Sequence, residues 1–166
     1  MALGDLDGDG DLDVVVNTYR GPAAAYRHDT PAPRLAIRLR GQPPNTHGIG
    51  ARVRVRGGPV PQSTEIVSGG RYLSGDGATR CFAAGTIDAD LQIEVAWRSG
   101  KVSRISGVRG NRLYEIQEPA ADGGQTVTTP VAKPTPASGT PLFEDVTAWL
   151  HGHAHADASF NDYERQ

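Results

Sequence analysis

The sequence predicts an all-β protein, and three observations lead to that prediction. Its apolar runs are short and mostly alternate with polar residues, the period-two pattern of half-buried strands. Glycine and proline are abundant, at 21 and 12 of 166 residues, while aromatic residues make up only 6%. No segment shows the apolar period of an amphipathic helix. Short strands joined by frequent turns are typical of a β-sandwich or barrel.

The first element is an acidic loop with aspartate at alternate positions. Ca²⁺ takes about six to eight oxygens, and calcium loops supply side chains from their first, third, fifth and ninth positions. The seventh position usually gives a backbone carbonyl, here that of Asp11, and Gly10 at the sixth allows the turn. Without a cation these carboxylates would repel one another, so we expect a structural calcium site; a metal-free acidic turn is the alternative. The side-chain ligands expected are Asp5, Asp7, Asp9 and Asp13.

A strand follows the loop. Residues 12–16 are Leu-Asp-Val-Val-Val, and their β-branched side chains favour a strand. Val16 stands at the twelfth position, where an EF-hand carries a bidentate glutamate before continuing as a helix. The loop is therefore not expected to belong to an EF-hand. Residues 20–33 contain proline and alanine without a period, which predicts a connector.

The next part of the chain predicts seven strands. Residues 34–40 and 51–56 alternate apolar side chains with arginines, so each predicts a half-buried strand. Turn signals such as Gly69-Gly70 and Ser99-Gly100 separate later strands. These are expected at residues 63–67, 80–83, 91–97, 102–105 and 112–116.

The composition changes beyond residue 118. Residues 119–140 are rich in Pro, Ala, Thr and Gly, which predicts a linker. Apolar character returns in residues 141–166, where 148–150 predict a helical turn. The expected domains are an amino-terminal piece at 1–29, a β domain at 30–118, the linker, and a lead-in segment at 141–166.

Charge and motifs exclude several classes of function. The formal net charge is −2, which gives no overall attraction to nucleic acid or membranes. No apolar stretch approaches the roughly 20 residues that span a bilayer. Cys81 is the single cysteine, so no internal disulfide can form. No nucleophile elbow, Cys-x-x-Cys pair or complete dinucleotide fingerprint occurs, and we expect no enzymatic activity.

Three histidines near the end of the chain are candidates for a second metal site. If the segment were extended, His151, His153 and His155 would share one face and could hold zinc or copper. The simpler interpretation is a solvated tail.

Six arginines would form a basic stripe if their two strands were neighbours. Such a stripe could bind an acidic polysaccharide; nucleic acid is not expected, because no aromatic residue is interleaved. The simpler interpretation is a solvated sheet face, with Glu94 and Glu115 as charge partners. The arginines are Arg34, Arg38, Arg40, Arg52, Arg54 and Arg56.

Several stretches resemble the ASPIC/UnbV domain. The main ones are Asn-Thr-His-Gly-Ile-Gly-Ala-Arg-Val at 45–53 and Ser-Gly-Gly-Arg-Tyr-Leu-Ser at 68–74, with others at 62–65, 93–100 and 111–118. The family usually has Phe-Gly-Leu-Gly and Trp-Pro-Ser-Gly where this chain has Phe-Ala-Ala-Gly from Phe82 and Trp-Arg-Ser-Gly from Trp97. Both departures fall at positions expected to be turns.

The two ends of the chain show further resemblances. Residues 2–17 resemble the FG-GAP/VCBS repeat, the calcium-bearing hairpin of integrin-like β-propeller blades. Residues 143–147, 153–155 and 160–166 resemble the segment that leads into a propeller in bacterial members of the cartilage acidic protein 1 family. We therefore expect the chain to be part of a longer protein.

The resemblance implies a fold and a class of function. The fold would be a β-sandwich or barrel-like ASPIC/UnbV domain preceded by a partial propeller blade. The function would be that of an extracellular or periplasmic calcium-containing module for binding or adhesion, with a protein or glycan ligand. The alternative is a metal-dependent enzyme or enzyme subunit of secondary metabolism or redox chemistry, using the tail histidines and a missing propeller.

Overall fold

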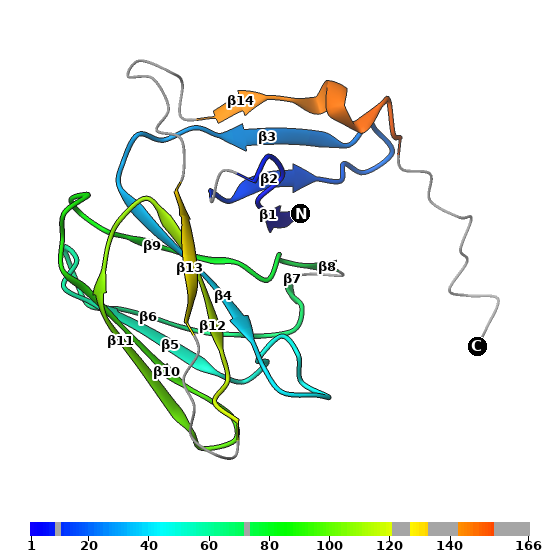
Figure 1. Ribbon diagram of the computed structural model, residues 1–166. Helices are drawn as coiled ribbons and strands as arrows, with labels where there is room; N and C mark the ends of the chain where they lie inside the picture. Colours follow the sequence, from blue (N-terminus) through cyan, green and yellow to red (C-terminus); the bar gives the residue numbers. More distant parts are fainter. Residues whose placement is uncertain (9–10, 72–73, 121–126, 133–142, 155–166) are drawn as a thin grey trace.

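The prediction of an all-β protein is confirmed. The computed structural model describes residues 1–8, 11–71, 74–120, 127–132 and 143–154 (Figure 1). Within these ranges the chain forms strands and one 3-10 turn, η1 Thr147–Leu150, at the position expected for a helical turn. No helix in the described part is long and apolar enough to cross a membrane.

The first sheet joins both ends of the described chain. Its order is β1-β2-β3-β14, and each neighbouring pair is antiparallel (Figure 1). β2 is the strand expected after the acidic loop. β3 lies in the range predicted to be a connector, and β14 brings the tail segment into the same sheet, with Phe143 opposite His28. The strands are β1 Ala2–Gly4, β2 Asp13–Val16, β3 Ala24–His28 and β14 Phe143–Asp145.

Two further sheets contain all seven strands expected in the middle of the chain. One sheet has the order β11-β10-β5-β6 and the other β13-β12-β4-β9. The first comprises β5 Arg52–Arg56, β6 Gln62–Glu65, β10 Leu91–Ala96 and β11 Val102–Val108. The second comprises β4 Arg34–Arg40, β9 Arg80–Ala83, β12 Arg112–Gln117 and β13 Val127–Ala132.

Strand β13 lies inside the range predicted to be a linker. It pairs antiparallel with β12, and β12 runs parallel to β4. Leu35 near the start of β4 lies opposite Arg112, which lies opposite Ala132 at the end of β13. β13 therefore ends two strands away from the start of β4, at the same end of the sheet.

The two larger sheets enclose one hydrophobic core. Inward residues alternate along β4, β5 and β10, as the sequence predicts, and belong to one cluster of buried side chains. Trp97 closes one end of the core, where its Nε1 donates a buried hydrogen bond of 2.9 Å to Ser103 Oγ. This arrangement is a β-sandwich. Its central side chains are Leu35, Ile37, Leu39, Val53, Val55, Leu91, Ile93, Val95, Tyr114 and Ile116.

A short hairpin of the sandwich contacts the first sheet. It comprises β7 Gly70–Arg71 and β8 Ser74–Gly75. The Asp76 carboxylate, just beyond it, accepts a 3.1 Å hydrogen bond from the Leu3 N–H of β1. Arg71 Nε donates to both oxygens of Asp76, and this hydrogen bond is the main reason that the pKa of Asp76 lies below its ordinary value. A charged Asp76 thus holds β1 against the sandwich.

Candidate metal centre

Three of the predicted calcium ligands converge in the loop between β1 and β2. One carboxylate oxygen each from Asp5, Asp7 and Asp13 lies within 4.8 Å of the other two. Asp7 is exposed, Asp5 is half-buried, and Asp13, the first residue of β2, is buried. Asp9 and Gly10 lie outside the described residues.

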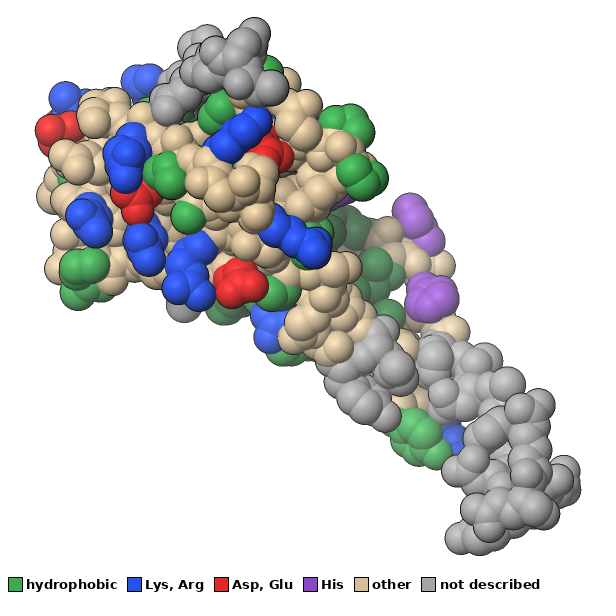
Figure 2. Space-filling view, turned by 90° about the horizontal axis from the view of Figure 1, so that it is seen from below, with side chains coloured by type: hydrophobic (Ala, Val, Ile, Leu, Met, Phe, Trp, Pro, Cys, Tyr) green, Lys and Arg blue, Asp and Glu red, His purple; other side chains and the backbone are tan. Residues whose placement is uncertain are grey.

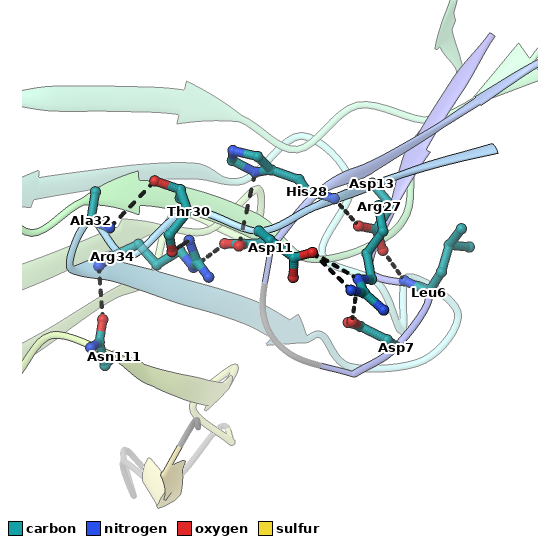
Figure 3. Close-up of polar contacts among 11 residues, drawn as sticks. Leu6, Asp7, Asp11, Asp13, Arg27, His28, Thr30, Ala32, Arg34 and Asn111 are labelled. Carbon is teal, nitrogen blue, oxygen red and sulfur yellow. Dashed lines mark hydrogen bonds and ion pairs between the residues drawn. The ribbon is translucent and has the colours of Figure 1, made fainter. Parts of the chain in front are cut away.

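Asp13 is held in place by backbone donors. Its Oδ2 accepts 2.6 Å from the Leu6 N–H within the loop, and its Oδ1 accepts 2.8 Å from the His28 N–H at the end of β3 (Figure 3). The buried carboxylate therefore closes the loop and ties it to β3. A carboxylate oxygen has two lone pairs, so these bonds leave acceptor capacity for a cation.

Arg27 on β3 connects this loop to the tail. Its Nε lies 3.8 Å from Asp7 Oδ2, and its Nη2 lies 2.9 Å from Asp29 Oδ2 and 2.5 Å from Glu144 Oε2 on β14. The hydrogen bond to Asp29, with the charges of all three carboxylates, raises the pKa of Arg27 above its ordinary value. The sequence does not predict this network, because Glu144 is far from Arg27 in the chain and only the pairing of β3 with β14 brings the two together.

The Asp11 side chain pairs with a residue of the sandwich instead of pointing to the other aspartates. It is 1% exposed and forms an ion pair with Arg34 Nε at the start of β4 (Figure 3). Arg34 is itself 8% exposed and donates from Nη1 to Thr30 O at 2.9 Å. The His28 Nδ1 lies 3.9 Å from the other Asp11 oxygen. Asp11 was predicted to offer its backbone carbonyl to calcium, and that role stays a prediction.

The geometry of the three converging oxygens suits a hard cation. Ca²⁺ binds oxygens at about 2.3–2.6 Å, so two ligands on opposite sides of the ion lie up to about 5 Å apart. A mutual separation within 4.8 Å fits inside that limit. A ligand set of carboxylates alone suits Ca²⁺, Mg²⁺ or Mn²⁺, whereas zinc and copper sites usually include imidazole or thiolate ligands.

Comparison with known families identifies the family to which most of the sandwich sequence is similar. The sequence model of the ASPIC and UnbV family matches residues 41–123, half of the 166-residue chain. The chain belongs to the ASPIC and UnbV family. The matched range of the ASPIC and UnbV domain holds the strands from β5 to β12, so the acidic loop lies outside it. No curated protein and no solved structure matches the chain. The resemblances to the FG-GAP/VCBS repeat and to cartilage acidic protein 1 stay predictions.

His151 and His153 do not adopt the extended arrangement from which the second metal site was predicted. His151 ends η1 with a left-handed backbone, φ 50° and ψ 37°, and His153 N–H bonds back to Leu150 O. Both side chains are exposed, and His155 lies outside the described residues. Among the residues that the structure describes, the three aspartates form the only metal-competent group of His, Cys, Asp or Glu.

The predicted basic stripe is wrong as a single surface. β4 and β5 belong to different sheets of the ASPIC and UnbV sandwich, so Arg38 and Arg40 do not share a face with the arginines of β5. Arg34 is buried against Asp11 and belongs to neither outer face. The expected charge partners are present: Arg40 Nε lies 3.0 Å from Glu115, and Arg54 Nη1 lies 3.0 Å from Glu94. The stripe was predicted because alternation fixes which face a side chain occupies but not which strands are neighbours.

Proposed function

We propose that the loop of residues 5–13 binds one structural Ca²⁺ ion and that the chain is an extracellular, calcium-stabilised module for binding or adhesion. The observation that carries the first part is the convergence of Asp5, Asp7 and Asp13 within 4.8 Å. The second part rests on the resemblance to extracellular calcium-bearing proteins, with a protein or a glycan as the ligand.

Repulsion among the carboxylates supports a cation. Two unit charges about 4.8 Å apart at an effective dielectric constant near 20 repel by about 3 kcal/mol. The charge of Arg27 offsets part of this repulsion, since its Nε lies 3.8 Å from Asp7 Oδ2. The same guanidinium also forms ion pairs with Asp29 and Glu144, so it neutralises Asp7 only in part. The attraction of a divalent cation to each of the carboxylates of Asp5, Asp7 and Asp13 would outweigh their mutual repulsion.

The ion would also stabilise the hairpin. Asp13 bridges the loop and β3 through Leu6 and His28, so a cation held by this carboxylate fixes the spacing of β2 and β3. Extracellular calcium modules typically bind with Kd of about 10⁻⁴–10⁻³ M. At about ten times Kd, binding to the folded chain alone would add about 1.4 kcal/mol of stability.

Calorimetric titration of Ca²⁺ into the chelator-treated chain tests the calcium site. We expect one site in the native chain, together with a rise in Tm. Asp7→Asn keeps the shape of the side chain and removes its charge, so we expect affinity to fall by about tenfold or more, a loss of about 1.4 kcal/mol. Asp88→Asn, at an exposed position outside the loop, is the matched control and should bind like the native chain.

Two outcomes would contradict the calcium proposal. One is a folded native chain that shows neither heat nor a Tm shift at millimolar Ca²⁺. The other is equal affinity in the native chain and the Asp7→Asn variant, because an ion held elsewhere would not respond to this carboxylate.

A further inference from the structure

A second binding surface lies on the outer face of the sheet β11-β10-β5-β6. Arg52, Arg54 and Arg56 alternate with buried Val53 and Val55, so their side chains leave the sandwich on the solvent side. Arg104 on β11 lies on the same surface, because the strand register aligns it with Arg54 across β10. Arg54 lies opposite Glu94 on β10, and Glu94 lies opposite Arg104. We name the surface formed by Arg52, Arg54, Arg56 and Arg104 the arginine face.

The arginine face carries more positive than negative charge. Glu94 shares its carboxylate between Arg54 Nη1 at 3.0 Å and Arg104 Nε at 3.1 Å, and these two hydrogen bonds lower the pKa of Glu94. Arg52 Nη2 lies 3.6 Å from Glu65. Arg56 has no carboxylate within ion-pair distance among the described residues. Four guanidinium groups thus meet two carboxylates, which leaves a net charge of +2.

The guanidinium groups remain accessible to a ligand. The side chain of Arg104 is 71% exposed, that of Arg52 54% and that of Arg54 43%. Each guanidinium has five N–H donors, so the internal ion pairs leave several donors for solvent or a ligand. Lys and Arg side chains predominate over acidic ones on the underside of the sandwich, where β5, β10 and β11 lie (Figures 1 and 2).

The face also contains a shallow hollow of about 130 Å³. Arg54, Arg56, Glu94 and Arg104 line it, together with Gln92. Pockets for drug-sized ligands measure about 300–1,000 Å³, so this hollow suits one small anionic group. Sulfate and carboxylate groups match the planar fork of arginine, which binds them through two parallel hydrogen bonds.

The spacing of the arginines favours a polymer with repeated anionic groups. Side chains two residues apart on a strand are separated by about 6.8 Å, so Arg52 and Arg56 lie about 14 Å apart. A single small anion could contact only part of this array. The other outward residues of the four strands are small or uncharged, and none is aromatic: Ser63, Gln92, Ala96, Val102 and Ser106. Single-stranded nucleic acids need aromatic stacking partners, which this face lacks.

We propose that the arginine face binds an acidic polysaccharide through its sulfate or carboxylate groups. The hollow between Arg54, Arg56 and Arg104 receives one anionic group, and Arg52 contacts the next along the polymer. The surface lies on the sandwich, whereas the aspartate loop lies on the sheet β1-β2-β3-β14. Polysaccharide binding is therefore independent of the calcium proposal and persists in chelator.

Titration with a size-defined heparin octasaccharide tests this inference, in EDTA and at 50 and 200 mM NaCl. Arg54→Gln/Arg104→Gln should weaken binding about tenfold or more and make log K less steep in log[salt], because two fewer anionic groups are neutralised. Glu94→Gln should strengthen binding several-fold, since it removes the negative charge at the centre of the face. The matched control is Arg38→Gln/Arg40→Gln, which removes the same charge from β4 on the opposite sheet. Circular dichroism checks that each variant is folded.

Four results would overturn the proposal. The native chain could fail to bind the octasaccharide at 50 mM NaCl. The Arg54→Gln/Arg104→Gln variant could bind like the native chain. The Arg38→Gln/Arg40→Gln control could lose as much affinity, which would assign binding to net charge rather than to this face. A single-stranded DNA of equal charge could bind as tightly as the octasaccharide, which would make the surface a nucleic-acid site.

Discussion

Removing Arg34 should destabilise the chain more than removing any exposed arginine. Its guanidinium forms the ion pair with Asp11, and the two residues are 8% and 1% exposed. Replacing one partner of a buried ion pair leaves an uncompensated charge and typically costs about 3–5 kcal/mol. We therefore expect Arg34→Met, which keeps much of the side-chain volume, to lower the free energy of unfolding by about that amount.

The contacts around Arg34 explain why the cost should be large. The substitution also removes the hydrogen bond from Nη1 to Thr30 O, whose net value is about 1 kcal/mol. Asp11 would keep His28 Nδ1 at 3.9 Å, but this imidazole is a charged partner only when it is protonated. The Asp11 carboxylate would therefore lose the partner that is always charged.

Urea denaturation, followed by tryptophan fluorescence and by circular dichroism, measures the effect. A double-mutant cycle with Arg34→Met and Asp11→Leu isolates the pair. The double variant should recover most of the lost stability, because an apolar pair of similar volume often replaces a buried ion pair without cost. Arg112→Met, at an exposed position on β12, is the control and should change stability by less than about 0.5 kcal/mol.

Two outcomes of the double-mutant cycle would contradict the predicted role of Arg34. A coupling energy below about 0.5 kcal/mol would show that Asp11 and Arg34 do not act as a pair. A loss in Arg34→Met no larger than in Arg112→Met would show that burial of the guanidinium contributes nothing. Because Asp11→Leu keeps the backbone carbonyl, its calcium affinity also tests whether the side chain or the carbonyl of Asp11 matters to the loop.

Two further predictions concern the sandwich and its contact with β1. Ser103→Ala should destabilise the chain by about 1–3 kcal/mol in urea, because it leaves the buried Trp97 N–H without its acceptor; a cost no greater than that of an exposed Ser→Ala change would contradict this. Asp76 has a folded-state pKa below the unfolded value of about 3.9, so its stabilisation is present above that pH and is lost as the pH falls through the lower folded value. Asp76→Asn should therefore show a shallower fall in Tm between pH 5 and pH 2 than the native chain, and equal slopes would contradict the role of Arg71.

The strands that could be predicted are those whose side chains alternate. β4, β5 and β10 bury every second residue in the core, so their sequences show apolar residues with a period of two. β3 has no such period: its Ala, Ala, Tyr, Arg and His residues are held by backbone pairing with β2 and β14. Strand β13 likewise could not be predicted, because it lies in a segment rich in proline, threonine and alanine. Backbone pairing with a strand from elsewhere in the chain produces no pattern in the sequence of the paired strand itself.

The candidate metal centre could be predicted because its ligands are close in the sequence. The spacing of Asp5, Asp7 and Asp13 is a local property of one loop. The contacts of Asp11 with Arg34 and of Arg27 with Glu144 depend on how distant strands assemble. The arginine face lies between these cases, since alternation predicts that Arg52, Arg54 and Arg56 share a face, while Arg104 joins them only through the strand order.

The pairing of β3 with β14 makes the sandwich an insertion within a β-hairpin. His28 and Phe143 are register partners, so the whole of residues 29–142 serves as the hairpin loop. As a flexible chain, this loop would cost about 3 kcal/mol more to close than a four-residue turn. The folded sandwich removes much of that entropy cost, because β13 ends beside the strands at which the chain entered. Docking of the tail strand is therefore coupled to folding of the sandwich, because an unfolded insertion would restore the entropy cost of closing the hairpin. The contacts of Asp76 with Leu3 and of Arg34 with Asp11 add to this coupling, so the two parts of the chain should unfold together.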